Sequence, residues 1–412
     1  MNLYIFNQSR RGGAVYGVGT YIRELTAALK DSEIKVYVVN LASLKPQIQK
    51  EEIDGIQYWH FPAPVQWTES NPYQWALYYR NIVYVLQLHS KDKKELIFHL
   101  NYMENKPLAD ALKSVFDCKT VLVVHYLRSV MTLLGNISRI RRIISQPDEP
   151  ADLLEISAKE SFLDEKELLQ SHSIDKIICL SNHTFDLLHR DYRIEKEKMV
   201  VLSNGLYDMA NTHPKIQLLR KNWNLSVNEK IILFVGRLDE AKGLGYLIRA
   251  FRKLLEIIPN CRLMITGSGN YDFYLQEAKD ICTKITFTGL LEMKELFELY
   301  QIASIGVMPS LTEQCNYVAI EMMMHNIPMV STAAPGLAEM TEDGISSLQV
   351  PLIEHPDRVE IDTELLAEKM LYLLQHPAEA QKIGQNARKR YLKEYSSEVF
   401  RKNMLQFYKS LF

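Results

Sequence analysis

The sequence predicts an α/β protein with two Rossmann-like domains, each built on a parallel sheet. Short apolar runs alternate with longer amphipathic runs along the chain, a pattern typical of parallel strands covered by helices. The alternation starts anew after residues 204–221, where turn residues occur without clear periodicity. A length of 412 residues also suits about two or three domains. We therefore expect two parallel sheets that face each other across a cleft.

Each expected strand is a short apolar run bounded by polar or turn residues. For the first domain we expect strands at residues 3–6, 35–40, 96–99, 120–125, 176–180 and 199–202. For the second domain we expect strands at residues 231–235, 262–266, 285–288, 305–308 and 328–331. The linker between the domains is expected within residues 204–221.

The composition excludes several classes of protein. Hydrophobic residues make up 47% of the chain and charged residues 24%, which is ordinary for a globular protein. The 48 basic and 50 acidic residues leave a net charge of −2, so nothing favours overall attraction to nucleic acid. The first apolar run is too short for a signal peptide, and no stretch approaches the roughly 20 residues needed to span a bilayer. We expect a cytoplasmic protein whose five scattered cysteines are mostly reduced core residues.

Two glutamates follow the strand expected at 305–308. Glu313 would lie in the loop at the strand's carboxyl end, and Glu321 would lie within the helix expected at 318–325. Open α/β sheets bind their ligands at that edge, and a carboxylate accepts hydrogen bonds from sugar or ribose hydroxyls. The alternative is one helix-capping glutamate and one glutamate on a solvated helix face.

A glycine-containing loop follows the strand expected at 231–235. It reads GRLDEAKG at residues 236–243 and carries Arg237 and Lys242. Arginine presents a planar fork of donors and lysine a compact charge, and a diphosphate needs both kinds of neutralisation. Taken singly, either cation could be an ordinary surface charge. Together with the two glutamates, they suit a ligand with an anionic middle and hydroxylated ends, which describes a nucleotide sugar.

Taken in chain order, these motifs resemble those of family 4 of the retaining glycosyltransferases (glycosyl transferases group 1), which have the GT-B fold. The resemblance is carried by residues 236–243, by Glu313 and Glu321, and by residues 328–330 (PMV) and 335–339 (PGLAE). It covers nearly the whole chain. It implies an acceptor-side domain at residues 1–205, a nucleotide-sugar-binding domain at 206–392, and a terminal helix at 393–412 that returns to the first domain.

The resemblance also implies roles for individual residues. Glu313 would hold donor-sugar hydroxyls, Glu321 would hold the ribose hydroxyls, and Arg237 and Lys242 would stabilise the leaving diphosphate. His125, which closes the strand expected at 120–125, would contact the donor sugar, so the catalytic candidates are Arg237, Lys242, Glu313 and His125. The donor-binding candidates also include Gly17, Asn204, Gly236, Leu290, Asn316, Tyr317, Val318 and Glu321.

The chain departs from the family's pattern at two places. The family usually has a double glycine in the loop before the first helix, which is expected here at residues 20–30, but Tyr16 precedes Gly17. The family also commonly follows its first glutamate with small and glycine residues, whereas Gln314, Cys315 and Asn316 stand here. This second departure keeps open the alternative of a catalytically silent GT-B scaffold or chaperone subunit of another transferase.

The expected reaction is transfer of a sugar from a nucleoside diphosphate sugar to a hydroxyl acceptor with retention of configuration, as in polysaccharide biosynthesis. No cofactor or metal is expected, since no two aspartates are separated by one residue as in the manganese site of the other major glycosyltransferase fold. A nicotinamide site is the weaker alternative, because residues 265–270 (ITGSGN) lack the third glycine of a dinucleotide fingerprint.

The acceptor could be a glycan, a lipid-linked molecule or a peptide. Basic residues interleave with isoleucines at residues 137–144 in an expected helix. This helix could meet the inner face of a membrane peripherally, or it could present a solvated face over a core stripe.

Overall fold

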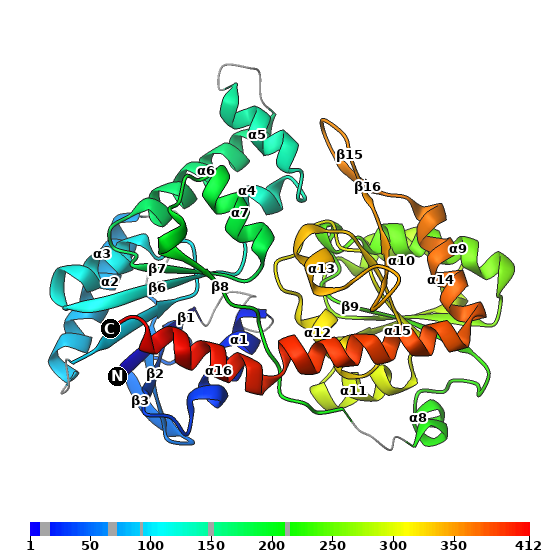
Figure 1. The fold of residues 1–412 in the computed structure, drawn as a ribbon, viewed down its shortest axis with the longest axis horizontal. Helices are drawn as coiled ribbons and strands as arrows, with labels where there is room; N and C mark the ends of the chain where they lie inside the picture. Colours follow the sequence, from blue (N-terminus) through cyan, green and yellow to red (C-terminus); the bar gives the residue numbers. More distant parts are fainter. Residues whose placement is uncertain (9–16, 65–71, 91–93, 147–151, 211–214) are drawn as a thin grey trace. The chain divides into compact units, whose positions relative to one another are not determined.

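A computed structural model describes residues 1–8, 17–64, 72–90, 94–146, 152–210 and 215–412 (Figure 1). The chain forms two compact units. The first unit comprises Met1–Leu127, Glu160–Tyr207 and Ser397–Phe412, and the second comprises Arg128–Lys159 and Asp208–Ser396. The chain therefore passes from one unit to the other after residues 127, 159, 207 and 396. Residues 9–16, which include most of the expected glycine-rich loop and Tyr16, lie outside the described residues.

The first unit contains an eight-stranded sheet with the order β3-β4-β2-β1-β5-β6-β7-β8. All of its strand pairs are parallel except β3 with β4, which is antiparallel. In chain order the strands are Asn2–Gln8 (β1), Lys35–Ser43 (β2), Gln49–Ile53 (β3), Ile56–Pro62 (β4), Leu96–Leu100 (β5), Cys118–Val124 (β6), Lys176–Cys179 (β7) and Met199–Val201 (β8).

All six strands predicted for the first domain are present, with boundaries shifted by at most three residues. Strands β3 and β4 were not predicted. β3 is a mostly exposed polar edge strand of sequence QKEEI, and such charged edges protect a sheet from pairing with other chains. β4 alternates between buried and more exposed side chains, so its apolar residues never form the continuous run on which the prediction relied.

The second unit contains a six-stranded parallel sheet with the order β11-β10-β9-β12-β13-β14 and a separate antiparallel hairpin of β15 and β16. The five predicted strands are confirmed. The three additional strands have only three residues each, which is too short for a periodicity signal. In chain order the strands are Lys230–Val235 (β9), Cys261–Thr266 (β10), Ile285–Gly289 (β11), Ile305–Met308 (β12), Met329–Thr332 (β13), Leu348–Val350 (β14), Leu352–Glu354 (β15) and Val359–Ile361 (β16).

Helices cover both faces of each sheet (Figure 1). Those of the first unit are Gly17–Leu29 (α1), Pro72–His89 (α2), Lys106–Val115 (α3), Asn182–Arg190 (α7) and Ser397–Lys409 (α16), while Leu153–Gln170 (α6) continues from the second unit into the first. Those of the second unit are Arg128–Thr132 (α4), Ile137–Ser145 (α5), Ile216–Asn222 (α8), Leu244–Ile257 (α9), Tyr271–Glu277 (α10), Met293–Ile302 (α11), Tyr317–Met324 (α12), Pro335–Met340 (α13), Thr363–Gln375 (α14) and Pro377–Arg390 (α15).

The hydrophobic core of each unit lies between the sheet and its helices. In the second unit, Ile232 and Phe234 of β9 belong to the same buried cluster as Leu247 and Phe251 of α9. The buried residues of α9 recur at helical spacing, so one face of the helix packs inward. All five cysteines are free thiols, of which Cys282 is exposed and the others are buried. Among the helices that the structure describes, none is long and apolar enough to cross a membrane.

Residues 128–159, which we expected in the N-terminal domain, group instead with the second unit. Asn136 donates a hydrogen bond to the main-chain oxygen of His355, and Arg139 donates one to that of Asp357. These bonds join residues more than 200 positions apart, and no local pattern in the sequence encodes them.

A buried polar group joins the C-terminal helix to the core of the first unit. The hydroxyl of Tyr408 in α16 lies 2.8 Å from Nδ1 of His99, and that of Tyr21 in α1 lies 3.3 Å from Nε2. Arg401 also donates a hydrogen bond to the main-chain oxygen of Ala28. His99 is fully buried. Burial, reinforced by the neighbouring His125, lowers the pKa of His99 to about 3.

Acid should weaken the folded state through His99. Unfolded histidine has a pKa of about 6.5, so between pH 6.5 and 3 the unfolded chain binds a proton that the folded chain does not. Above about pH 6.5, His99 does not reduce the free energy of unfolding, and that free energy then decreases as the pH falls from 6.5 toward 3. We expect His99 to lower the free energy of unfolding by about 2 kcal/mol between pH 7 and pH 5, as measured by urea titration. In His99→Gln this part of the pH dependence should disappear, and an unchanged pH dependence would contradict the assignment.

Candidate functional site

The strand order of the second unit reverses between β9 and β12. From β9 the sheet grows through β10 to β11 on one side, and then the chain returns to add β12, β13 and β14 on the other. Loops that leave the carboxyl ends of strands on the two sides of such a switch point diverge and form the crevice in which α/β sheets bind ligands. The loop after β9 carries Lys242, and the loop after β12 carries Glu313. Both predicted motifs therefore meet at the switch point.

Three hydrogen bonds converge on one carboxylate oxygen of Glu313. Its Oε1 accepts from Lys242 Nζ at 2.5 Å, from Ser310 Oγ at 2.8 Å and from Asn316 Nδ2 at 2.8 Å. The Glu313 side chain is only 9% exposed, and that of Lys242 is 22% exposed. Together the donors determine the orientation of the carboxylate. The sequence predicted Lys242, Glu313 and Asn316 at the site, but it gave no reason to single out Ser310.

The two loops approach closely because glycines stand at their contacts. A Cβ on Gly243, which has φ +68°, would lie 1.8 Å from the main-chain oxygen of Pro309. The amide of Leu311 also donates to the oxygen of Ala241 at 2.8 Å. On the other side, a Cβ on Gly336 in α13 would lie 2.2 Å from the oxygen of Gln314. The loop that carries Glu313 therefore packs between two backbones that leave no room for a side chain.

Asn316 explains the unusual sequence after Glu313. It is the N-cap of α12, and its Oδ1 accepts from the amide of Ala319 at 3.2 Å while its Nδ2 donates to Glu313. Its φ of −76° requires no glycine. The departure from the family's pattern thus provides a helix cap that also orients the carboxylate.

Glu321 lies in α12 and is held by a residue of another helix. The hydroxyl of Tyr300 in α11 donates to Glu321 Oε2 at 2.6 Å. Burial, together with the charge of Glu321, raises the pKa of Tyr300 well above its usual value, so the tyrosine remains a donor at neutral pH. Tyr300 was not predicted at the site, because a partner 21 residues away on a different helix leaves no local signal.

Arg237 pairs within its own loop. Its Nε donates to Asp239 Oδ2 at 2.6 Å, and the side chains are 43% and 37% exposed. Asp239 Oδ1 in turn accepts from the amide of Lys242 at 3.1 Å. Asp239 therefore positions both predicted cations of this loop, Arg237 through its side chain and Lys242 through its backbone.

The glycine run at residues 265–270 has a packing cause. A Cβ on Gly267 would lie 1.8 Å from the oxygen of Gly236, and the amide of Leu238 donates to the oxygen of Ser268 at 2.8 Å. Gly236 likewise donates to the oxygen of Thr266 at 3.0 Å. The glycines let the loop of Arg237 continue alongside β10, which accounts for the resemblance to a dinucleotide fingerprint.

The remaining candidates of the second unit lie at the same edge of its sheet. Tyr317 and Val318 form the first turn of α12, where helix amides can face an anion. Leu290 follows β11 and is 58% exposed. Nine of the twelve predicted site residues belong to the second unit, and Gly17, His125 and Asn204 belong to the first.

His125 follows β6 and is neutral at physiological pH. Its Nε2 lies 2.9 Å from Asn101 Oδ1, and the amide nitrogen of Asn101 donates to the oxygen of Phe6 at 3.0 Å. Since an amide oxygen only accepts, Nε2 carries the imidazole proton. Burial lowers the pKa of His125 to about 3, so this side chain offers hydrogen bonds and not a positive charge.

The other two candidates of the first unit differ in their surroundings. Asn204 follows β8 and is 2% exposed. Gly17 begins α1 and is exposed, and a methyl group added there would meet no atom of the described residues within 4 Å, its chain neighbours aside. Packing against those residues therefore does not require glycine at position 17. Within the same described parts of the chain, no group of three or more His, Cys, Asp or Glu side chains is arranged to hold a metal ion.

Two family comparisons cover most of the chain. Residues 15–207 match Glycosyltransferase Family 4, and residues 215–390 match Glycosyl transferases group 1. The chain belongs to the family 4 glycosyltransferases. An uncharacterized glycosyltransferase of Methanocaldococcus jannaschii is 28% identical over 253 residues, which span 59% of this chain and 62% of that relative. The matched region is thus less than two thirds of that relative's length.

Solved structures confirm the GT-B fold. Sucrose-phosphate synthase from Thermosynechococcus elongatus superposes with a TM-score of 0.76 at 21% identity, covering 100% of this chain and 98% of that one. Anabaena HepE in complex with UDP-glucose superposes with a TM-score of 0.74 at 16% identity, with both chains covered completely. The predicted class, an α/β protein with Rossmann-like domains, is therefore correct for this glycosyltransferase.

Gly336→Ala should displace the loop that carries Glu313. The added methyl group would meet the main-chain oxygens of Glu313 and Gln314 at 2.5 and 2.2 Å, and a shift of about 1 Å at a reacting group can cost about a hundredfold in rate. We expect a loss of that order in sugar transfer. Gly245→Ala, in helix α9, is the control. Its methyl group would meet Nη1 of the Arg249 side chain at 3.6 Å, which is an ordinary van der Waals contact. It should keep full activity and gain up to about 1 kcal/mol of stability. Equal activities of the two variants would contradict this account.

Proposed function

We propose that this glycosyltransferase moves a sugar from a nucleoside diphosphate sugar to a hydroxyl acceptor, with retention of anomeric configuration and without a metal ion. The observation that carries the proposal is the Lys242 and Glu313 pair at the switch point between β9 and β12. It places a cation, and an oriented carboxylate that can accept hydrogen bonds from sugar hydroxyls, at the edge where such sheets bind ligands.

The donor class is supported by a protein of the same fold. The Anabaena HepE structure contains UDP-glucose, a ligand with an anionic diphosphate between two hydroxylated ends. The site residues of this chain match that chemistry, with Arg237 and Lys242 on one loop, Glu313 on the other and Glu321 in helix α12.

The carboxylates have separate roles in the proposal. Because the three donors converge on Oε1 of Glu313, we assign the donor-sugar hydroxyls to Oε2. Tyr300 orients the carboxylate of Glu321 through Oε2, and we assign the ribose hydroxyls to that carboxylate. A hydrogen bond to a charged group contributes roughly 1.5 to 3 kcal/mol, so each carboxylate can orient one end of the donor.

The cations stabilise the leaving group. As the bond between the sugar C1 and the diphosphate oxygen breaks, negative charge grows on the phosphate, and preorganised donors at such a position contribute several kcal/mol to catalysis. A lysine ammonium has three N–H donors, so Lys242 can keep its bond to Glu313 while it reaches a phosphate oxygen. The acceptor oxygen bonds to C1 on the same face, and its proton passes to the departing phosphate. Arg237, held by Asp239, adds the second positive charge.

An apolar hollow in the first unit favours a lipid-linked molecule among the three acceptor classes. It has a volume of about 370 Å³ and lies at the carboxyl end of β4 beside α2. The described residues that line it are mostly apolar, with Gln74, Tyr78 and Asn81 as the side chains that carry polar groups, and pockets of this size and character bind apolar ligands. Helix α5 adds no apolar face for a membrane, since Ile137, Ile140 and Ile143 are buried.

Hydrolysis of a panel of nucleotide sugars tests the donor and the metal independence. We expect that, without acceptor, one donor class is converted to free sugar and nucleoside diphosphate, detected by mass spectrometry. The rate should be the same with and without EDTA. The free sugar should first appear with the donor's anomeric configuration in a proton NMR spectrum. No conversion of any donor, together with no binding of UDP or GDP, would instead indicate a silent scaffold.

Glu313→Gln should separate binding from chemistry. The amide loses the charge that pairs with Lys242 and orients the sugar hydroxyls, so we expect hydrolysis to fall at least about a hundredfold, or roughly 3 kcal/mol. The affinity for the nucleoside diphosphate, measured by calorimetry, should stay within about twofold, because that ligand lacks the sugar. Glu277→Gln, which breaks the ion pair with Arg249 elsewhere in the second unit, should leave both quantities unchanged. Wild-type turnover in Glu313→Gln would overturn the assignment.

A further inference from the structure

A turn in the 128–159 segment lies against the loop that carries Glu313. Gly135 has φ +85°, and a Cβ on it would lie 2.8 Å from the oxygen of Leu311 and 3.0 Å from Cβ of Thr312. Its neighbour Leu134 packs against the hydrophobic core of the second unit. The backbone of this turn therefore touches the two residues that immediately precede Glu313.

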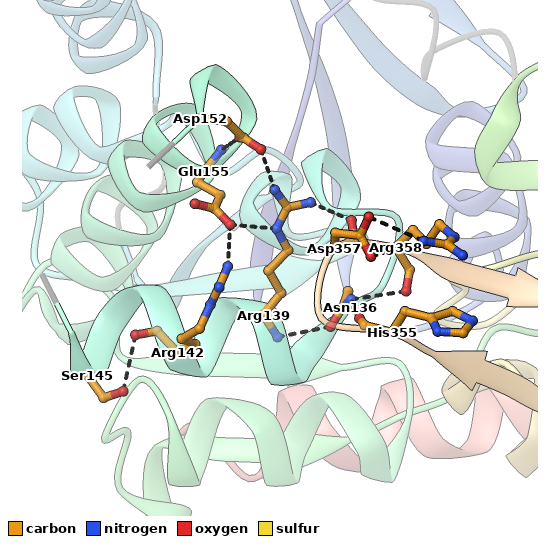
Figure 2. Close-up of polar contacts among 9 residues, drawn as sticks. All are labelled: Asn136, Arg139, Arg142, Ser145, Asp152, Glu155, His355, Asp357 and Arg358. Atoms are coloured by element: carbon orange, nitrogen blue, oxygen red, sulfur yellow. Dashed lines mark hydrogen bonds and ion pairs between the residues drawn. The ribbon is translucent and has the colours of Figure 1, made fainter. Parts of the chain in front are cut away.

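Asn136 ties this turn to the hairpin of β15 and β16. It is fully buried, and its Oδ1 caps α5 by accepting from the amide of Arg139 at 2.9 Å. Its Nδ2 donates to the main-chain oxygens of His355 at 2.7 Å and Arg358 at 3.3 Å. Figure 2 shows the side chain between the start of α5 and the hairpin turn at residues 355–358. The side-chain amide of Asn136 thus forms hydrogen bonds with both the first turn of α5 and the hairpin turn.

Arg139 makes a second tie to the same turn. Its Nη1 donates to the main-chain oxygen of Asp357 at 2.6 Å, while Nε and Nη2 bind Glu155 Oε1 at 2.7 Å and Asp152 Oδ2 at 2.5 Å (Figure 2). Both Arg139 and Glu155 are buried. A planar guanidinium bound on both sides has little freedom, so the segment is firmly attached to the turn.

The hairpin itself is anchored beside the loop of Lys242. Val359 and Ile361 of β16 belong to the hydrophobic core of the second unit. A Cβ on Gly243 would lie 3.2 Å from Cδ1 of Ile361, and the hydroxyl of Tyr246 donates to the oxygen of Val359 at 3.3 Å. The hairpin therefore connects the attachment point of the segment with the second loop of the site.

We propose that Asn136 and Arg139 are positioning residues for the donor site. Their bonds to residues 355–358, which we call the hairpin lock, hold Gly135 against Leu311 and Thr312 and so keep Glu313 within reach of Lys242. The effect of the hairpin lock on the reaction rate rests on the proposed function, whereas its effect on the position of the Glu313 loop does not. The hairpin lock acts on the two residues that precede Glu313, whereas Asn316 binds the Glu313 side chain and Gly336 lies against the main-chain oxygens of Glu313 and Gln314.

Asn136→Asp tests the lock with minimal change of shape. Aspartate is as good an N-cap as asparagine, so α5 keeps its start, but a carboxylate faces the two main-chain oxygens where an N–H donor stood. Asn136→Ser is the second variant, since serine also caps a helix and adds no charge. Arg142→Ala is the matched control, because it removes another bond to Glu155 and leaves both ties to residues 355–358 in place.

The first measurement is hydrogen exchange of the ligand-free protein. In both Asn136 variants we expect the amides at residues 310–316 to exchange about tenfold faster, with β9 and β10 unchanged and Arg142→Ala like the wild type. The second measurement uses the nucleotide sugar that the wild type hydrolyses fastest. There kcat should fall about tenfold in both Asn136 variants while KM stays within twofold, because Glu313 acts on the reacting sugar.

Unchanged exchange at residues 310–316 in Asn136→Ser would overturn the proposal. A lower melting temperature with neither faster exchange nor lower kcat would also overturn it, because Asn136 would then be only structural. If the wild type hydrolyses no donor, the proposed function fails, and the exchange measurement alone decides whether the lock holds the loop.

Discussion

The site depends on two loops that lie closer together than side chains would permit. Gly243 meets Pro309, and Gly336 meets Gln314, at distances that exclude even a methyl group. This contact of backbones brings an ammonium and a carboxylate together at the switch point of the sheet. Once the loops are in place, short hydrogen bonds can converge on one oxygen of Glu313. The glycines are thus needed for the geometry of charged groups that they do not themselves touch.

The polar contacts around the site follow a consistent division. Three of the proposed ligand-binding side chains have neighbours that orient them: Asn316 and Ser310 for Glu313, Tyr300 for Glu321, and Asp239 for Arg237. Oriented groups lose less conformational entropy when a ligand binds, and preorganised dipoles are what stabilise developing charge. The supporting residues come from the loops themselves or from a neighbouring helix, so the arrangement belongs to the fold of the second unit.

The buried polar groups of the first unit have a different character. His99 and His125 are kept neutral by burial, and their partners are hydroxyl and amide groups. His99 links α1, β5 and α16, which gives the C-terminal helix a specific place on this unit. His125 presents a neutral ring at the carboxyl edge of its sheet. Charge at the described site residues is therefore concentrated in the second unit.

The sequence by itself determined the fold class, eleven of the strands and the loops that carry Arg237, Lys242 and Glu313, because periodicity and motif spacing are local properties of the chain. It also singled out Asn316, but as an exception and not as a helix cap that orients Glu313. Only the tertiary structure decided that Ser310 and Tyr300 support the carboxylates, and that residues 128–159 belong with the second unit. Lys242 and Glu313 are 71 positions apart, and Asn136 and His355 are 219 apart. Contacts over such separations arise from packing of whole elements, which no short stretch of sequence encodes.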